Sequence, residues 1–89
     1  AYLRVKRVDE AARAFERAIR INPDHAEAHT ALGEIYINQK RLDNAVRVLE
    51  RAVTLAPGMR EAHFRLGQAY QAKGLEEKAE QEFRRAKSP

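Results

Sequence analysis

Two histidines, His25 and His29, stand four positions apart, a spacing that could support metal chemistry. Residues at i and i+4 lie on one face of a helix, where two imidazoles can share a zinc ion. Zinc proteases of the H-E-x-x-H type carry a catalytic glutamate directly after the first histidine, whereas this sequence has Ala26 there. Two imidazoles alone make a weak site, and His29 recurs as His63. We therefore predict that His29 is a packing residue and that the chain binds no metal.

Residues suited to covalent catalysis are scarce. The sequence has no cysteine, and its one serine is Ser88, next to the last residue. A catalytic serine needs a base held beside it by the fold, which a frayed chain end does not supply. Aspartate and glutamate are plentiful, but they stand at predicted helix starts or on polar faces, where capping and solvation explain them. We expect neither an enzyme nor a bound cofactor.

Arginines recur along the chain and raise the possibility of a nucleic-acid surface. They stand on the polar faces of successive predicted helices: Arg13, Arg17, Arg20, Arg47, Arg51, Arg84 and Arg85. Glu16 and Glu50 interrupt this series at the spacing of helical ion pairs, and no exposed aromatic residues are interleaved for base stacking. Acids and bases are mixed along the chain, and the net charge is only +4. We predict a solvated convex face and no nucleic-acid partner, with an RNA-binding helical repeat as the least favoured alternative.

A repeat organises these residues. Shifting the sequence by 34 positions aligns Tyr2, Tyr36 and Tyr70. The same shift aligns further triples and pairs: Ala11, Ala45 and Ala79; Ala18, Ala52 and Ala86; Phe15, Leu49 and Phe83; Leu32 and Leu66; Gly33 and Gly67; Pro23 and Pro57. Self-similarity at a fixed period of this length is typical of solenoid proteins.

Each unit reads as two amphipathic helices, because apolar residues recur at spacings of three and four. The expected helices span 1–6, 9–21, 25–39, 43–55, 59–73 and 76–87. Asp24 and Glu27 have the spacing of a capping box, and Gly58 and Glu61 repeat it with a weaker cap. Glycine costs about 1 kcal/mol relative to alanine inside a helix. We therefore expect Gly33 and Gly67 to permit close helix packing, against the small residues Ala45 and Ala52 and against Ala79 and Ala86.

At these residues the chain resembles the tetratricopeptide repeat, whose pattern contains Leu-Gly, Tyr, Ala, Phe and Pro at fixed offsets. The middle unit carries His29, Leu32, Gly33, Tyr36, Ala45, Leu49, Ala52 and Pro57, and the last carries His63, Leu66, Gly67, Tyr70, Ala79, Phe83 and Ala86. Histidine replaces the family's frequent tryptophan, and Leu49 replaces a phenylalanine. The resemblance implies an all-α, right-handed superhelical solenoid of antiparallel helix pairs, containing about two and a half repeats. Residues 1–25 would be a partial repeat that lacks most of its first helix, 26–59 a full repeat, and 60–89 the last repeat.

The two ends of this array are predicted to differ. Tyr2 corresponds to Tyr36, so we expect upstream sequence in a larger parent protein. Without it, an apolar strip near Tyr2, Leu3 and Phe15 could join two copies of the chain in a homodimer. The last helix has Glu80, Glu82 and Lys87 where earlier units have apolar residues, which predicts a polar, exposed terminal face.

The resemblance also implies a concave groove, lined by first helices, that holds a peptide or partner segment. We place there Glu27, Thr30, Glu34, Asn38, Glu61, Phe64, Arg65 and Gln68. Some family members grip an acidic C-terminus with a carboxylate clamp of Lys, Asn and Arg. Here Thr30, Ala31, Glu34 and Glu61 replace its members, and only Arg65 agrees. This predicts a neutral or basic partner segment.

The sequence therefore favours a protein-protein interaction scaffold within a larger protein. A self-association module is the alternative, and a spacer array whose groove binds nothing also stays open. Because apolar runs are short, we expect a soluble segment without a membrane partner, and we favour a cytoplasmic location.

Overall fold

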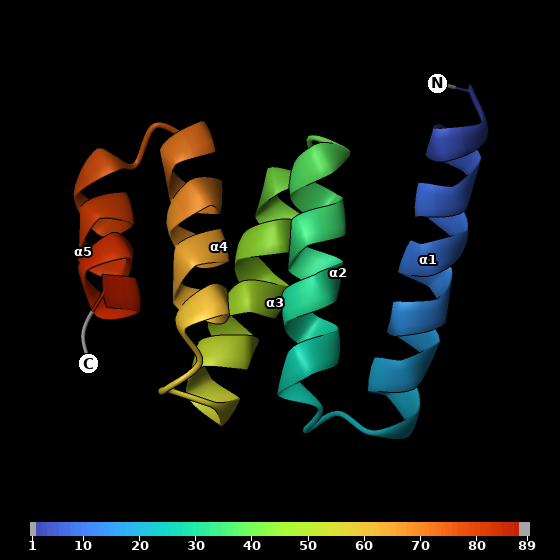
Figure 1. Ribbon diagram of the computed structural model, residues 1–89, viewed down its shortest axis with the longest axis horizontal. Helices are drawn as coiled ribbons and strands as arrows, with labels where there is room; N and C mark the ends of the chain where they lie inside the picture. The colour runs from blue at the N-terminus through green and yellow to red at the C-terminus, as the bar shows by residue number, and fades with distance from the viewer. Residues whose placement is uncertain (1, 88–89) are drawn as a thin grey trace.

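The computed structural model describes residues 2–87, with side chains from residue 7 onward. Within this range the chain forms five helices and no strand: α1 (Tyr2–Ile21), α2 (Ala26–Asn38), α3 (Leu42–Leu55), α4 (Arg60–Ala72) and α5 (Glu76–Lys87). Figure 1 shows them side by side, from α1 at one end of the row to α5 at the other. The predicted all-α class is confirmed, and the last four helices begin and end within one residue of the predicted bounds.

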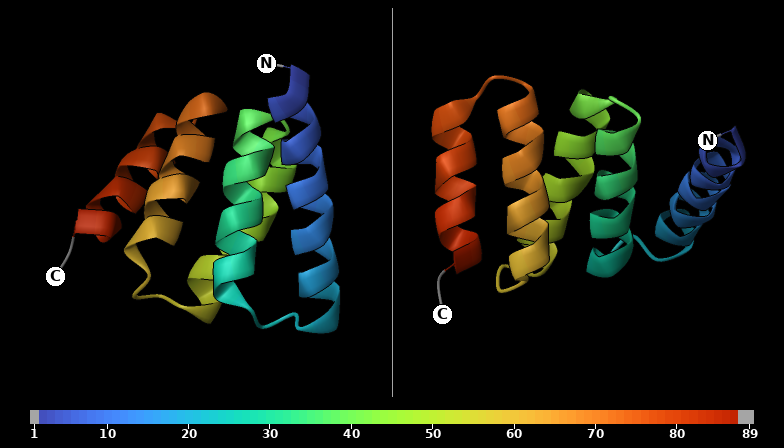
Figure 2. Two further views of the ribbon diagram at one scale, coloured as in Figure 1. Left: turned by 45° about the vertical axis from the view of Figure 1, so that its right-hand side comes forward. Right: turned by 45° about the horizontal axis from the view of Figure 1, so that its top comes forward.

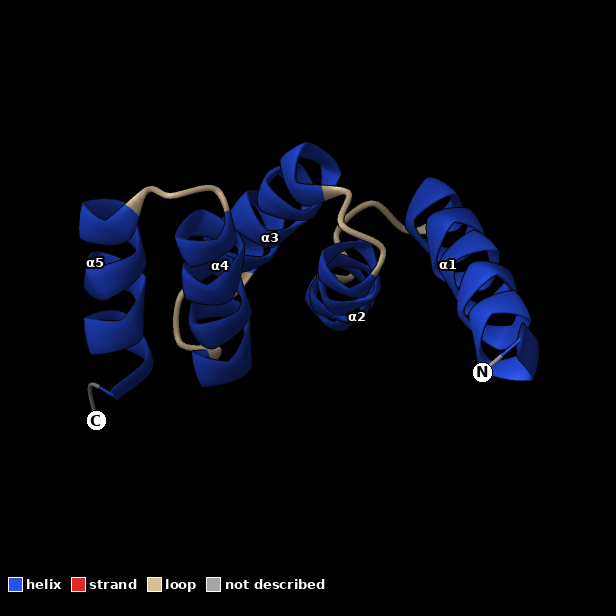
Figure 3. Ribbon diagram, turned by 90° about the horizontal axis from the view of Figure 1, so that it is seen from above, coloured by secondary structure: helices blue, strands red, loops and turns tan. Residues whose placement is uncertain are grey.

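The helices pack as consecutive antiparallel pairs. The closest packing joins α2 to α3 and α4 to α5, and α2 and α4 also contact each other. Seen from above in Figure 3, α3 lies to one side of α2 and α4. The two views of Figure 2 likewise keep α1 beside α2 and α5 beside α4. This is the stacked arrangement of a solenoid, in which each unit buries its apolar face against its neighbour.

The core consists of a few large side chains between small ones. Leu32, Leu49 and Leu66 are the largest fully buried residues. Each helix also contributes at least one buried alanine: Ala12, Ala28, Ala45, Ala52, Ala62, Ala69 and Ala79. Within the described residues, no helix is both long and apolar enough to cross a membrane.

The two helical glycines permit close approach, but not to the residues that we expected. A methyl group added at Gly33 would collide with the side chain of Leu49. One added at Gly67 would lie 2.6 Å from the ring of Phe83. Of the alanines predicted as partners, Ala45, Ala52 and Ala79 are buried and Ala86 is partly buried, but the glycines are needed because a bulky residue of the second helix occupies the space above each of them.

The predicted break in the first unit is absent, because α1 runs without interruption from Tyr2 to Ile21. In the later units the first helix ends in a turn whose residue has positive φ, 65° at Lys40 and 82° at Gly74. Lys6 is the equivalent residue, and it stays helical. A lysine adopts a left-handed conformation only where surrounding packing enforces it, so a helix that continues is the less costly outcome here.

The predicted capping boxes are also wrong. α2 begins one residue later than expected, with His25 at its N-cap, and α4 begins after Met59. Neither cap residue forms a side-chain capping hydrogen bond. Asp24 therefore lies outside the helix, where its carboxylate pairs with Arg51 instead.

Candidate functional site

A pocket lies between the first helices of the middle and last repeats. It has a volume of about 320 Å³ and is lined by Glu27, Thr30, Ala31, Glu34, Met59 and Glu61. Four of the eight predicted groove residues are among them. Glu27, Thr30 and Glu34 share one face of α2 because they are three and four residues apart. Contact between α2 and α4 brings Glu61 to the same pocket.

Arg65 is the cation of this surface, and it is already paired. Its guanidinium lies 3.3 Å from Glu34 of α2 and 4.0 Å from Glu61, one turn earlier on α4. It also donates a hydrogen bond of 3.0 Å to Gln68. Arg65 is thus partly buried. Three carboxylates with one arginine leave the groove acidic.

Thr30 does not present a free hydroxyl to the groove. The residue is only 4% exposed, and its hydroxyl oxygen lies 3.0 Å from the carbonyl oxygen of Ala26 and 3.2 Å from the sulfur of Met59. A hydroxyl that back-bonds to its own helix has no unmet need for a ligand. Thr30 therefore shapes the wall of the pocket.

Phe64 and Asn38 lie outside this pocket. The Phe64 side chain is 43% exposed, and its ring packs at a tilt against Phe83 of α5, with 5.7 Å between centroids. Asn38 is exposed at the C-terminal end of α2. The predicted groove residues thus fall into two places: an acidic pocket between α2 and α4, and the aromatic ring of Phe64 farther along α4.

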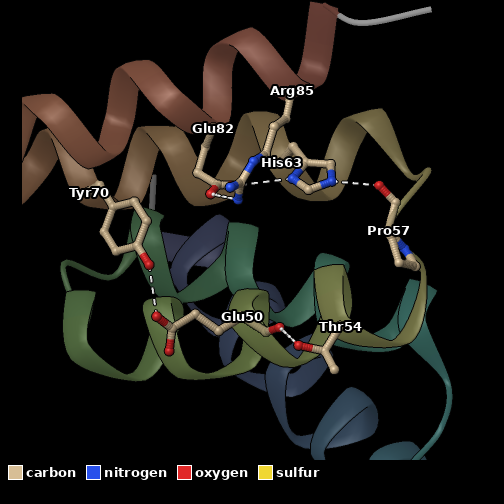
Figure 4. Close-up of polar contacts among 7 residues, drawn as sticks. All are labelled: Glu50, Thr54, Pro57, His63, Tyr70, Glu82 and Arg85. Carbon is tan, nitrogen blue, oxygen red and sulfur yellow. Dashed lines mark hydrogen bonds and ion pairs between the residues drawn. The ribbon is translucent and has the colours of Figure 1, made fainter.

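Hydrogen bonds between repeats hold α2 and α4 in position, and the sequence analysis missed them. The Tyr36 hydroxyl donates to Glu16 at 2.5 Å, and one period later the Tyr70 hydroxyl donates to Glu50 at 2.7 Å (Figure 4). A second equivalent pair joins Gln39 to Asp9 at 2.8 Å and Lys73 to Asp43 at 2.5 Å. Glu16 and Glu50 therefore bond to tyrosines, not to the arginines predicted from helical spacing. A search for polar pairs that recur at the repeat period would have found them.

These contacts change the acidity of their groups. Burial, followed by the hydrogen bond to Glu16, raises the pKa of Tyr36 to about 12. Burial and the bond to Glu50 likewise raise the pKa of Tyr70. The hydrogen bond from Lys73 lowers the pKa of the Asp43 carboxyl. Each shift favours the protonation state that keeps the inter-repeat bond.

Glu82 is buried, which contradicts the prediction that it belongs to an exposed polar end face. It is only 6% exposed, and its two carboxylate oxygens lie 2.8 Å from His63 Nδ1 and 2.8 Å from Arg85. The other ring nitrogen of His63 lies 2.7 Å from the carbonyl oxygen of Pro57, as Figure 4 shows. Two partners satisfy the buried carboxylate, whereas Glu80 and Lys87 are exposed as predicted.

The sequence matches a family profile described as tetratricopeptide repeat over residues 1–60, and a second profile of the same description over residues 39–88. The chain therefore belongs to the tetratricopeptide repeat family. No curated protein was found to match it.

Solved structures share the fold. A crystal structure of MamA is 31% identical, with a TM-score of 0.84, over 94% of this chain and 49% of the MamA chain. A second MamA crystal structure gives 31% and 0.83 over 94% and 46%. The second TPR of Spaghetti (RPAP3), bound to the HSP90 peptide SRMEEVD, is 19% identical with a TM-score of 0.88 over 96% and 79%. This chain thus spans about half the length of the MamA chains that it matches.

Proposed function

We propose that this chain is a protein-protein interaction module whose groove, between α2 and α4, binds a neutral or basic peptide segment and catalyses no reaction. The observation that carries the proposal is the acidic pocket itself, which is lined by three glutamates, Glu27, Glu34 and Glu61. Arg65 pairs with two of these carboxylates. Glu27 has no ion-pair partner among the described residues, so a lysine or arginine of a ligand would gain a contact without breaking one.

The groove residues proposed for contact are Glu27, Glu34, Glu61 and Gln68, with Phe64 as an apolar platform farther along α4. One structural neighbour carries a bound peptide, SRMEEVD, which has an acidic end. This chain lacks the clamp residues that would hold such an end, and a carboxylate ligand would meet three glutamates. We therefore infer the same mode of binding with the opposite preference in charge.

Selection from a random peptide library tests the proposal. Peptides that bind the wild-type chain should be enriched in lysine and arginine and depleted in acids. The variant Glu34→Lys should lose this preference, because it reverses the charge of one of the three glutamates that line the pocket. Glu80→Lys, on the exposed side of α5, is the matched control and should select the same peptides as wild type. Identical selections from wild type and Glu34→Lys would reject the groove as the binding surface.

Self-association is the second candidate, and it rests on the apolar residues of α1. Ile21 is 81% exposed, and Phe15 is only partly buried. The continuous α1 replaces the short first helix, 1–6, that the sequence predicted, and the side chains of Tyr2 and Leu3 lie outside the described residues. We propose that a homodimer, if formed, uses α1. Light scattering should then show that Ile21→Glu gives monomers, while a dimer that survives this change would exclude the C-terminal end of α1.

A further inference from the structure

The middle and last repeats have equivalent pockets, and one residue of a four-residue polar network differs between them. The network of the last repeat uses Pro57, His63, Glu82 and Arg85. One period earlier in the sequence, these positions hold Pro23, His29, Val48 and Arg51. All four of these residues line one cavity of about 490 Å³ beside α3. The middle repeat therefore keeps the proline, histidine and arginine, and it has valine where the last repeat has its carboxylate.

In the last repeat the carboxylate of Glu82 completes the pocket. Its oxygens reach His63 and Arg85, and the remaining cavity there is about 360 Å³. The carbonyl of Pro57 can only accept a hydrogen bond, so Nε2 of His63 donates to it, while Nδ1 lies against the carboxylate of Glu82 (Figure 4). The chain thus shows how this constellation binds a carboxylate.

In the middle repeat the equivalent groups are His29 and Arg51, and Val48 supplies no carboxylate to pair with them. His29 is only 5% exposed, and its Nδ1 donates to the carbonyl oxygen of His25 at 2.9 Å. Its Nε2 has no hydrogen-bond partner among the side chains that the structure describes. Among the described residues, Arg51 has one ion pair, at 3.6 Å to the exposed carboxylate of Asp24. His29 lines the cavity, and a ring nitrogen without a protein partner at the edge of a cavity can form a hydrogen bond to a polar ligand.

The charges around this pocket favour an anion. Arg47 and Arg51 line it from α3, and Glu50 is the one carboxylate among the lining residues. An oxygen of Glu50 already accepts the hydroxyl proton of Tyr70. The two arginines and the histidine are therefore the groups free to meet a ligand, since the Asp24 contact is long and exposed.

We propose that this pocket binds the carboxylate of a glutamate or aspartate from an acidic segment of a partner protein, beside Val48, which stands where the last repeat has Glu82. Arg51 donates to one oxygen and His29 Nε2 to the other. Because Nδ1 already donates, the ring takes up one proton from solvent on binding. Val48 and Pro23 pack against the aliphatic stem of the ligand. This surface is separate from the acidic groove and has the opposite charge preference.

Nitrogen NMR of labelled histidine and arginine side chains tests the proposal. The probes are the capped tripeptide Ac-Ala-Glu-Ala-NH2, its glutamine counterpart, and inorganic phosphate. The glutamate peptide should shift the Arg51 signal. It should also move the His29 Nε2 signal from the chemical shift of an unprotonated nitrogen to that of a protonated one. Both changes should reach a plateau as the peptide concentration rises. The glutamine peptide should do neither. Arg51→Gln should weaken binding about tenfold, because one charge-assisted hydrogen bond is lost.

Exchanging the residue types at the equivalent positions 48 and 82 supplies the matched variants. Val48→Glu should place His29 Nε2 in the protonated position without any peptide and abolish the response, because it rebuilds the arrangement of the last repeat. Glu82→Val should make His63 respond to the glutamate peptide. Glu34→Lys, in the groove, should leave the His29 response unchanged, so that this proposal can fail independently of the groove. A full response in Val48→Glu, an equal response to the glutamine peptide, or equally tight binding of phosphate would overturn the proposal.

Discussion

Single residues decide how closely the two helices of each repeat approach. Gly33 and Gly67 lie under Leu49 and Phe83, and no larger residue fits there without moving those side chains. The sequence showed that these glycines needed a packing reason, because glycine is costly inside a helix. It did not show which residue stands above each glycine, since that depends on the rotation of the second helix about its axis.

The substitution Gly67→Val should lower the free energy of unfolding by about 2 kcal/mol, because the added methyls would enter the space of the Phe83 ring. Urea denaturation of wild type and variant measures this difference. Gly58→Val is the control, because nothing lies within 4 Å of the position of its added carbon and its φ is not left-handed. Equal stability of wild type and Gly67→Val would contradict the helix pairing described above.

Charged residues were the least predictable from sequence. Glu82 was expected at the surface because its equivalents Ala14 and Val48 suggested a face turned toward a following repeat. It is buried because His63 and Arg85 satisfy it, and such partners come from different helices. Comparing one repeat with the next could have suggested the pair, since Val48 and Glu82 stand at the same position beside an unchanged histidine.

At the scale of helices, the sequence located the four elements of the later repeats well and misjudged the first. Periodic apolar residues, with Gly and Pro between them, mark the ends of α2 to α5. The break expected between residues 6 and 9 is equivalent to the turns at Lys40 and Gly74, which adopt positive φ. Without strong local signals such as Gly or Pro, a helix continues unless tertiary contacts stop it.

Lys40 occupies a left-handed turn that its relative Gly74 adopts without strain. Lys40→Gly should therefore stabilise the chain by about 0.5 to 1 kcal/mol, because removal of the β-carbon relieves the strain by more than the added chain entropy costs. Thermal melting of the variant should show a higher Tm. Gln71→Gly, within the last turn of α4, is a comparison at which glycine should instead lower the Tm. A lower Tm for Lys40→Gly would mean that the lysine side chain has a stabilising role that outweighs the strain.

For the molecule as a whole, bonds between repeats set the angle from one unit to the next and so shape the groove. The tyrosine-to-glutamate bonds recur at the repeat period, with Tyr36 to Glu16 and Tyr70 to Glu50. The sequence predicted each repeat as a unit, but the relation between units depends on partners twenty residues apart, which helix periodicity does not reveal. The groove residues stay a prediction from the sequence, which gave no sign that Arg65 is paired with Glu34 and Glu61.

These bonds predict a loss of stability in alkaline solution. The pKa of Tyr36 is about 12 in the folded chain, above the value of about 10 expected when unfolded. A folded pKa that is raised stabilises the native state fully below pH 10, and this stabilisation is lost as the pH rises through 12. Tyr70 is shifted in the same direction. Urea titrations at pH 8 and pH 11.5 should show a smaller decline for the double variant Tyr36→Phe, Tyr70→Phe than for wild type. Equal declines would show that other groups account for the alkaline effect.

The central claim, an acidic groove that prefers a basic segment, is tested most directly by a charge swap. A lysine-containing peptide from the library selection, labelled with a fluorophore, is titrated against the wild-type chain and Glu34→Lys, together with a version of the peptide in which that lysine is glutamate. We expect fluorescence anisotropy to show that wild type prefers the lysine peptide and that Glu34→Lys prefers the glutamate peptide. If both proteins bind the two peptides with the same order of affinity, the charge of the groove does not select the ligand and the claim is wrong.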